Sequence, residues 1–274
     1  MEKALKLLPL GTSDFENLRH RDQIYVDKTD MICELASVPG KFFFARPRRF
    51  GKSLLLSTFE SLFRDGLKNF QGLKIEQLWT DKSTYKVIKL DFSRVKPEGT
   101  FEDFCQYFDN YLEAQFSLIG FKKEDNGLFL SNQIEIFLAG LSSSSLVLLI
   151  DEYDAPLTAC LDNKEFFERV RNYLSRFYGI LKANDRVLRF LFITGITKFN
   201  KTSIFSELNN LSDVSLSPRF GTLLGYTHEE VETYFDGYLT QSASVLSVSR
   251  DELLRSLTKQ YDGFCFERTT TKKV

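Results

Sequence analysis

Three consecutive residues near the start of the chain, Gly51, Lys52 and Ser53, have the types and order of a phosphate-binding turn. They lie within residues 42–59 (FFFARPRRFGKSLLLSTF), between an apolar stretch of strand length and an amphipathic stretch of helix length. A turn from a strand into a helix exposes backbone N–H groups and the positive helix end, where the phosphates of a nucleotide can bind. In this pattern the lysine contacts the β- and γ-phosphates, and the serine hydroxyl is a ligand of Mg²⁺.

The match to the pattern G-x-x-x-x-G-K-[ST] is incomplete, because Arg46 stands where the pattern has its first glycine. Taken alone, the turn is also compatible with a basic loop that caps an ordinary helix. On the phosphate-binding interpretation, we predict that the whole loop contacts the nucleotide. The predicted contact residues are Arg46, Pro47, Arg48, Arg49, Phe50, Gly51, Lys52, Ser53 and Leu54.

A second apolar run ends in two adjacent carboxylates, in residues 145–152 (SLVLLIDE). A buried parallel strand of this kind delivers its last side chains to the carboxyl edge of a sheet. We predict that Asp151 binds Mg²⁺ together with Ser53, and that Glu152 orients or deprotonates the attacking water. The strand taken singly is equally typical of the edge of an ordinary core. Its combination with the phosphate-binding turn favours nucleotide binding and hydrolysis.

Further candidates lie later in the chain. The predicted strand over residues 187–194 ends in Thr194, and Thr194 or Thr197 could position the attacking water or sense the γ-phosphate. Arg219 could stabilise the transition state, from the same chain or in trans within an oligomer. We therefore predict a catalytic set of Glu152, Lys52, Thr194 and Arg219.

Several other residues have more than one open interpretation. The loop arginines Arg46, Arg48 and Arg49 could neutralise charge on the γ-phosphate, contact an acidic partner surface or simply be solvated. The carboxylates of Asp91 and Asp154 could reach the nucleotide or its metal, or serve as cap and turn residues. Residues 25–28 could contact the base or ribose, or could pack in the core.

The elements that position these residues alternate between strand and helix patterns. Strands are predicted at 41–45, 86–92, 145–152 and 187–194. Helices are predicted at 53–63, 100–118 and 164–182, and a further helix follows the break at 126–127 and runs up to residue 140. Such alternation implies right-handed crossovers and a mostly parallel sheet covered on both faces. The predicted fold class is α/β, a P-loop NTPase with a three-layer αβα arrangement and a small C-terminal helical region.

We predict three regions along the chain. Residues 1–40 form a lead-in packed on the core, with a turn or cap at 13–14, a short strand at 23–26 and a helix at 27–35. Residues 41–200 form the core. Residues 201–274 are loop-rich and then helical, with a capping box at Thr227 and Glu230 and a helix at 250–260. This last region resembles a lid, although an extension of the core fits the pattern equally well.

Composition restricts the class of protein. The 274 residues are 43% hydrophobic and 27% charged, which excludes overall disorder. The net charge of -1 excludes an electrostatic field over the whole protein that would attract nucleic acid or acidic lipid. The four scattered cysteines and two histidines fit neither a zinc site nor a disulfide framework. With no signal-peptide pattern and no bilayer-length apolar run, we expect a cytoplasmic protein without a membrane partner.

Several segments, taken in order, resemble the bacterial AAA-ATPase-like family. They are LPLGTSDFENLR, YVDKTDMI, FFFARPRRFGKSLLLSTFESLF, LIDEYDAPL, TGITKFNKTSIFSELNNLSDVSLSPRFGTLLGYTHEEV and QYDGFCF. Arginine at position 46 looks normal for that family. The resemblance implies a P-loop core with Lys52 and Ser53 on phosphate and Mg²⁺, Asp151 on the metal, and Glu152 as the acid-base residue.

Members of this family commonly carry a PD-(D/E)XK nuclease-like domain after the ATPase-like part. Here the chain ends soon after QYDGFCF, and the remaining length holds no D-x-E-x-K site in a plausible strand pair. We therefore expect a shortened C-terminal region without a nuclease role.

Two function classes follow. The first is an ATP-binding, Mg²⁺-dependent ATPase that couples hydrolysis to conformational change in a partner protein or nucleic acid, as Glu152 favours. The second is a nucleotide-binding switch or scaffold with little turnover, favoured by the abrupt ending and the lack of an assured arginine finger. A shortened product without activity of its own is a third interpretation. The choice of ATP over GTP and the oligomeric state stay open.

Overall fold

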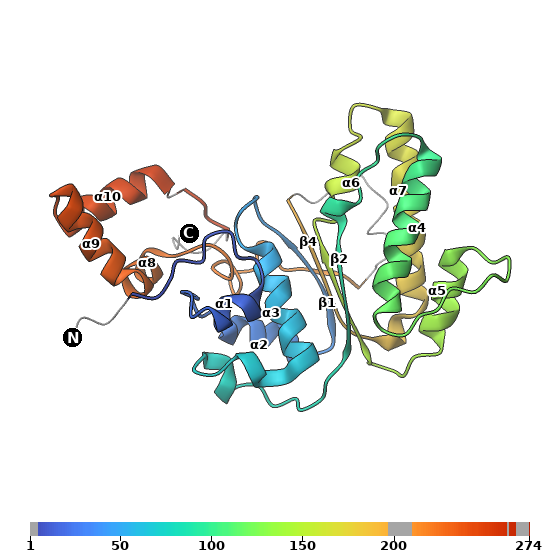
Figure 1. The fold of residues 1–274 in the computed structure, drawn as a ribbon, viewed down its shortest axis with the longest axis horizontal. Coiled ribbons are helices and arrows are strands. Elements are labelled where there is room, and N and C mark those ends of the chain that lie inside the picture. The colour runs from blue at the N-terminus through green and yellow to red at the C-terminus, as the bar shows by residue number, and fades with distance from the viewer. Residues whose placement is uncertain (1–4, 197–209, 262, 267–273) are drawn as a thin grey trace.

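The computed structural model describes residues 5–196, 210–261, 263–266 and 274. Within these residues the strands form one sheet in which every pairing is parallel (Figure 1). The order across the sheet is β2 (Lys86–Asp91), β3 (Leu146–Asp151), β4 (Leu188–Gly195), β1 (Gly40–Ala45) and β5 (Ser212–Asp213). The predicted α/β class with a parallel sheet is confirmed.

The central strands are buried on both faces, because side chains alternate along each strand. Along β3, Leu146, Leu148 and Ile150 belong to one apolar core, whereas Val147 and Leu149 belong to a second core on the opposite face. Both β3 and β4 are buried over their whole length. This burial explains why the two strands read as unbroken apolar runs.

Helices cover both faces and complete the predicted three layers. One core includes residues of α1 (Phe15–His20), α2 (Thr29–Ala36) and α3 (Lys52–Asp65), and the other includes residues of α4 (Phe101–Ser117), α5 (Leu130–Ala139), α6 (Ala155–Thr158) and α7 (Lys164–Ala183). Figure 1 shows the two groups on opposite sides of the sheet. Short 3₁₀ segments lie at Gly66–Asn69, Lys74–Gln77, Phe92–Arg94 and Asp185–Val187.

The strand register brings the ends of the strands to one edge. Phe44 of β1 is aligned with Thr194 of β4, and Asp91 of β2 is aligned with Asp151 of β3. Because all these strands run in the same direction, the segments that follow them leave from the same edge. This edge is where the predicted site residues meet.

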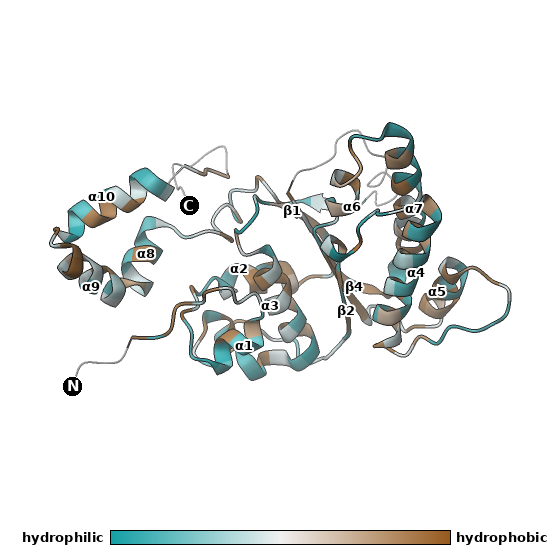
Figure 2. Ribbon diagram, turned by 45° about the horizontal axis from the view of Figure 1, so that its top comes forward, coloured by the Kyte–Doolittle hydropathy of each residue, from teal (hydrophilic) through white to brown (hydrophobic). Residues whose placement is uncertain are grey.

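The C-terminal helices α8 (His228–Tyr234), α9 (Asp236–Leu246) and α10 (Arg250–Tyr261) lie apart from the sheet (Figure 1). Figure 2 shows that α4, α7 and α10 each carry both hydrophilic and hydrophobic residues. Hydrogen bonds connect the C-terminal helices to the N-terminal lead-in: the Tyr238 hydroxyl donates to the Lys6 carbonyl (2.9 Å), and the Asp27 N–H donates to the Tyr234 hydroxyl (3.2 Å). The boundaries of the three regions stay a prediction.

Local predictions are partly confirmed. The capping box at the start of α8 is present, since the Glu230 N–H donates to the Thr227 hydroxyl and the Thr227 N–H donates to the Glu230 carboxylate. The prediction of a strand at 23–26 was wrong. Within this segment only Gln23 takes part in a β-bridge, an isolated one with Leu7. Helix α9 was missed, since its sequence DGYLTQSASVL contains glycine and several small polar residues with weak helix preference.

Replacing Phe59 with alanine tests the core beneath the phosphate-binding turn. The Phe59 side chain is fully buried on α3, with its ring centroid 5.0 Å from that of Phe190 and 4.9 Å from that of Phe192. We expect Phe59→Ala to lower the free energy of unfolding by about 3–5 kcal/mol in urea denaturation. The control Phe129→Ala, at a ring that is 81% exposed, should change it by less than about 0.5 kcal/mol. Equal effects of the two changes would contradict this account of the core.

Candidate functional site

The turn between β1 and α3 has the backbone of an anion-binding loop. Gly51 is the N-cap of α3 and has a left-handed backbone with φ of 92°, which glycine adopts without strain. No side chain caps the first turn of α3, so its N–H groups face the turn without a side-chain acceptor. Arg49 is also left-handed, with φ of 68°, an uncommon state for a residue with a side chain. The turn therefore presents helix-end donors to an anion.

The Asp151 carboxylate joins the phosphate-binding turn to the ends of β3 and β4. The Ser53 hydroxyl donates to Asp151 Oδ2 (2.5 Å), and the Thr194 hydroxyl donates to Asp151 Oδ1 (2.5 Å). Asp151 is only 6% exposed, so both of its oxygens depend on these protein donors. The structure thus brings together the two predicted metal ligands and the predicted Thr194.

Glu152 follows directly after β3 in a strained backbone conformation. Its φ is 49°, and its N–H donates to the Thr194 hydroxyl (3.3 Å). Burial raises the pKa of the Glu152 carboxyl above its ordinary value, and the neighbouring Asp151 raises it further, while Lys52 opposes the shift. A carboxylate with a raised pKa beside a phosphate-binding turn is a stronger proton acceptor than an ordinary glutamate.

The Lys52 ammonium is held by carbonyl oxygens of its own loop. Nζ donates to the carbonyls of Arg46 (3.1 Å) and Pro47 (3.0 Å), and the residue is only 5% exposed. Burial lowers the pKa of Lys52, whereas the nearby carboxylates, with Glu152 the strongest, raise it. The lysine is thus positioned between the loop and the acidic end of β3.

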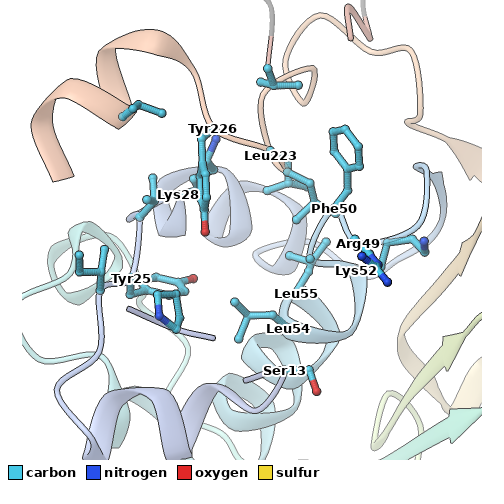
Figure 3. Close-up of a pocket in the computed structure, with 18 of the residues that line it drawn as sticks. Ser13, Tyr25, Lys28, Arg49, Phe50, Lys52, Leu54, Leu55, Leu223 and Tyr226 are labelled. Carbon is cyan, nitrogen blue, oxygen red and sulfur yellow. The ribbon is translucent and has the colours of Figure 1, made fainter. Parts of the chain in front are cut away.

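Arg48 and Arg49 are exposed at the turn. The charge of Arg48 acts on the pKa values of both Lys52 and Glu152, so it lies near them. Figure 3 shows the nitrogen ends of Arg49 and Lys52 close together at one end of a pocket, with Phe50 beside them. These cations give that end of the pocket a positive field.

Arg46 differs from the other loop arginines because its side chain points into the protein. It is 1% exposed, and its guanidinium donates to the carbonyls of Ser215 (2.6 Å) and Phe220 (3.2 Å). Its predicted contact with phosphate is therefore corrected for the side chain, since the side chain is buried and carbonyls of the same chain already accept from both of its terminal nitrogens. The Arg46 backbone remains part of the turn.

Arg219 is not brought to this cluster in the described conformation. Its guanidinium forms an ion pair with Glu34 on α2, so the predicted transition-state arginine is engaged elsewhere. Thr197, the alternative to Thr194, lies outside the described residues.

Asp91 and Asp154, the two carboxylates whose roles the sequence left undecided, both have hydrogen-bond partners within the protein. Asp91 accepts from the Ser93 N–H (3.1 Å) and pairs with Arg94 (3.2 Å), which is the cap interpretation. Asp154 is buried, and its Oδ2 accepts from the Ile196 N–H (2.9 Å), which ties the segment after β3 to the end of β4. Both residues thus support the edge of the sheet that carries the cluster.

A cavity of about 1140 Å³ extends from this cluster toward the C-terminal helices. Lys52, Ser53 and Glu152 are among the residues that line it, and Figure 3 shows Lys52 at one end. Most of the other lining side chains are apolar. The apolar lining comes from the lead-in, residues 223–226, α8 and α10, and includes Ile24, Tyr25, Val26, Leu223, Tyr226, Val231, Leu254 and Leu257. From the sequence, a lid beside the nucleotide site was one of two interpretations of the C-terminal helices. The individual residues that line the cavity were not predicted, because apolar residues carry no local signal of a binding site.

Lys28 also lines the cavity and connects the lead-in to the C-terminal region. It is buried, forms an ion pair with Glu230 of α8 (2.9 Å), and donates to the Thr222 carbonyl. Burial lowers its pKa, and Glu230 opposes that shift. One ion pair thus joins the lead-in to α8 at the wall of the cavity.

The oxygen atoms of the cluster suit a hard cation. Mg²⁺ is usually held by one or two protein oxygens together with phosphate oxygens and water. The Ser53 hydroxyl and the Asp151 carboxylate, already in contact, supply such a pair. Among the described residues, no group of three or more His, Cys, Asp or Glu forms a metal site by itself. The donor set therefore fits Mg²⁺ that arrives with a nucleotide.

Replacing Thr194 with valine tests the cluster. The change removes the donor to Asp151 and the acceptor for the Glu152 N–H while it keeps the shape of the side chain. Leaving buried polar groups without partners should lower the free energy of unfolding by about 1–3 kcal/mol in urea denaturation. Thr158→Val is the control, because this exposed hydroxyl bonds only the Asp154 carbonyl on its own helix. A Thr194→Val protein as stable as the control would contradict the arrangement.

Replacing Glu152 with glutamine tests the raised pKa through the pH dependence of stability. Because folding raises this pKa, Glu152 favours the folded state at low pH and loses that contribution as the pH rises through its folded value. Glutamine mimics the protonated acid, so Glu152→Gln should be more stable than wild type at pH 7.5 and no more stable at pH 4. Urea midpoints measure both, and the exposed Glu98→Gln should show no such pH dependence. A gain of equal size at both pH values would refute the assignment.

In the part of the chain that the structure describes, none of the helices is long and apolar enough to cross a membrane.

Known proteins resemble this chain in sequence. Residues 9–205 match the AAA-ATPase_like family model, described as "Predicted AAA-ATPase". A protein of Azotobacter chroococcum mcd 1, described as "Uncharacterized protein in vnfD 5'region", is 32% identical over 233 residues, which cover 84% of this chain and 45% of that protein. The chain thus spans less than half the length of this relative. The crystal structure of Cdc6p from Pyrobaculum aerophilum matches with a TM-score of 0.38 and 15% identity, over 78% of this chain and 50% of the other.

The family match covers most of the chain and contains both the phosphate-binding turn and the acidic end of β3. The relative is similar over a still larger share of the chain. The resemblance inferred from the motifs is confirmed, and the chain belongs to the predicted AAA-ATPase family.

Proposed function

We propose that this chain binds ATP in the cavity beside the turn and hydrolyses it in a Mg²⁺-dependent reaction. The observation that carries the proposal is the contact of the Asp151 carboxylate with the hydroxyls of Ser53 and Thr194, next to Lys52 and Glu152. Phosphoryl transfer depends chiefly on positioning and on neutralising charge, and this cluster offers groups for both tasks.

The phosphates would bind at the start of α3. The first-turn N–H groups and the Lys52 ammonium face the turn, and the exposed Arg48 and Arg49 add positive charge. Phosphate oxygens would replace the carbonyls of Arg46 and Pro47 as acceptors for Lys52. This exchange is favourable because a hydrogen bond between two charged groups is stronger than one to a neutral carbonyl.

Ser53 and Asp151 would hold Mg²⁺, which when bound neutralises negative charge on the phosphates. Their contact at 2.5 Å supports this role, since both oxygens already point to one place. Thr194 holds the other Asp151 oxygen and fixes the direction of the carboxylate.

Glu152 is the proposed base for the attacking water. Glu152 and Lys52 both line the cavity, and the raised pKa of Glu152 makes its carboxylate a stronger proton acceptor than an ordinary glutamate. The hydrogen bond from its N–H to Thr194 holds the strained backbone that presents this carboxylate. A water held there would lose its proton to Glu152 as it attacks the γ-phosphate.

The apolar part of the cavity would receive the base. Tyr25, Val26, Leu223 and Tyr226 offer aromatic and aliphatic surface on which a purine ring can pack. The lead-in and the C-terminal helices both contribute to these walls, and the Lys28–Glu230 pair joins them. Nucleotide binding would therefore draw the two regions together, which is how hydrolysis could drive a change in a partner protein or nucleic acid.

A nucleotide-dependent switch with little turnover is the second candidate. The pairing of Arg219 with Glu34 favours it, because the predicted transition-state arginine is not available to the phosphates in this conformation. Such a protein would bind ATP and act through the conformation that ATP stabilises.

Variants of Lys52 and Glu152 separate the two candidates. Lys52→Ala should weaken ATP binding by at least about 100-fold, because a cation at the phosphates is lost, whereas the exposed Lys122→Ala should leave binding unchanged. Glu152→Gln should keep ATP affinity within about threefold and lower phosphate release by about 100-fold or more. Titration with a fluorescent ATP analogue measures binding, and a phosphate-release assay with ATP and GTP, with and without DNA or RNA, measures turnover.

Wild-type protein that binds ATP without releasing phosphate would support the switch. Wild-type protein that binds neither ATP nor GTP would overturn both candidates. Circular dichroism of each variant checks that a loss of binding does not come from unfolding.

A further inference from the structure

The phosphate-binding turn is packed against aromatic residues from the C-terminal segment. The ring of Phe50 in the turn lies edge-on to the rings of Phe264 (centroids 4.9 Å apart) and Phe266 (5.4 Å). Phe264 and Phe266 stack on one another, with centroids 5.8 Å apart and an interplanar angle of 16°. Phe264 also lines the cavity. Residues more than 200 positions apart in the chain thus meet at the site.

Arg46 forms the second connection between the turn and this segment. Its guanidinium carbon lies 4.1 Å from the ring centroid of Phe44 and 4.1 Å from that of Phe266, so an aromatic ring lies near it on β1 and another in the C-terminal segment. Its N–H groups donate to the carbonyls of Ala45 (2.8 Å), Ser215 (2.6 Å) and Phe220 (3.2 Å).

The charge of Arg46 is buried among neutral groups. Burial lowers its pKa to about 10, and only the more distant charge of Asp213 opposes this shift. Carbonyl dipoles and aromatic rings therefore stabilise the cation, and a cation–π contact is worth most where water is excluded. Phe266 is one of the two rings that lie against this cation.

The Arg46 backbone connects this side chain to the nucleotide-binding lysine. The Arg46 N–H donates to the Gly195 carbonyl (3.1 Å), and the Arg46 carbonyl accepts from Lys52 Nζ (3.1 Å). Arg46 also occupies the place of the first glycine in the general phosphate-loop pattern. One residue therefore contacts the end of β4, the lysine and the C-terminal segment.

We propose that Arg46 is a positioning residue of the phosphate loop and that the docked Phe264–Phe266 segment sets the nucleotide affinity by holding Arg46 and Phe50 in place. This inference rests on the proposed binding of ATP at Lys52. Without the aromatic support the loop is less ordered in the free protein, and the entropy lost when ATP orders it lowers the affinity.

Phe266→Leu tests the proposal because leucine keeps an apolar side chain but removes the aromatic face. We expect the dissociation constant for ATP to rise about fivefold, the range for loss of a partly buried cation–π contact. Arg46→Lys should raise it by about tenfold, since lysine keeps the charge but lacks the planar donors. In the Arg46→Lys protein, Phe266→Leu should add less than twofold, because the planar guanidinium that stacks on the ring is already absent.

Phe101→Leu is a matched control for these variants. The guanidinium carbon of Arg169 lies 4.1 Å from the Phe101 ring centroid, the same distance as in the Arg46 contacts, but this pair connects α7 to α4. Phe101→Leu should leave the affinity for ATP unchanged. An equal rise in the dissociation constant for Phe101→Leu and Phe266→Leu would show a general effect of destabilisation and overturn the proposal.

Amide hydrogen exchange in the nucleotide-free protein separates this inference from the proposed function. Exchange of residues 46–51 should become at least about threefold faster in Phe266→Leu and stay unchanged in Phe101→Leu. Wild-type protein that fails to bind ATP refutes the proposed function, whereas the exchange rates still report whether the segment orders the loop. Unchanged exchange, or additive effects of Phe266→Leu and Arg46→Lys on ATP affinity, would overturn the inference.

Discussion

The arrangement depends on one buried carboxylate. Asp151 accepts from Ser53 at the start of α3 and from Thr194 at the end of β4, while it stands at the end of β3. A buried carboxylate without donors is costly, so the fold is stable only when these three segments meet. The same contacts bring Lys52 and Glu152 close enough to shift one another's pKa. Folding and the assembly of the proposed site are therefore the same event.

Much of the fold could be predicted because its signals are local. The apolar runs of β3 and β4, the glycine before α3 and the capping box at Thr227 each act within a few residues of the chain. A parallel sheet then brings the strand ends to one edge, which is why the proximity of Ser53, Asp151 and Thr194 could be predicted from motifs.

The remaining features depend on contacts between distant parts of the chain. Arg46 was predicted to contact phosphate, because nothing nearby in the sequence indicates that the carbonyls of Ser215 and Phe220 accept from its side chain. The apolar walls of the cavity come from the lead-in, residues 223–226 and the C-terminal helices, and apolar residues look alike whether they line a site or a core. The residues at 23–26 have strand preference but lack a neighbouring strand, so they pack as an irregular segment.

The order of the strands also sets a width. β4 lies between β1, which leads into the phosphate-binding turn, and β3, which carries the acids. Two adjacent strand spacings amount to roughly 10 Å, so the turn must arch over the end of β4 before Ser53 can touch Asp151. β4 therefore keeps a fixed distance between the strand that leads into the turn and the strand that carries the acids. The chain between β1 and α3 must cover this distance, so the width of β4 limits how far the turn could be shortened without separating Ser53 from Asp151.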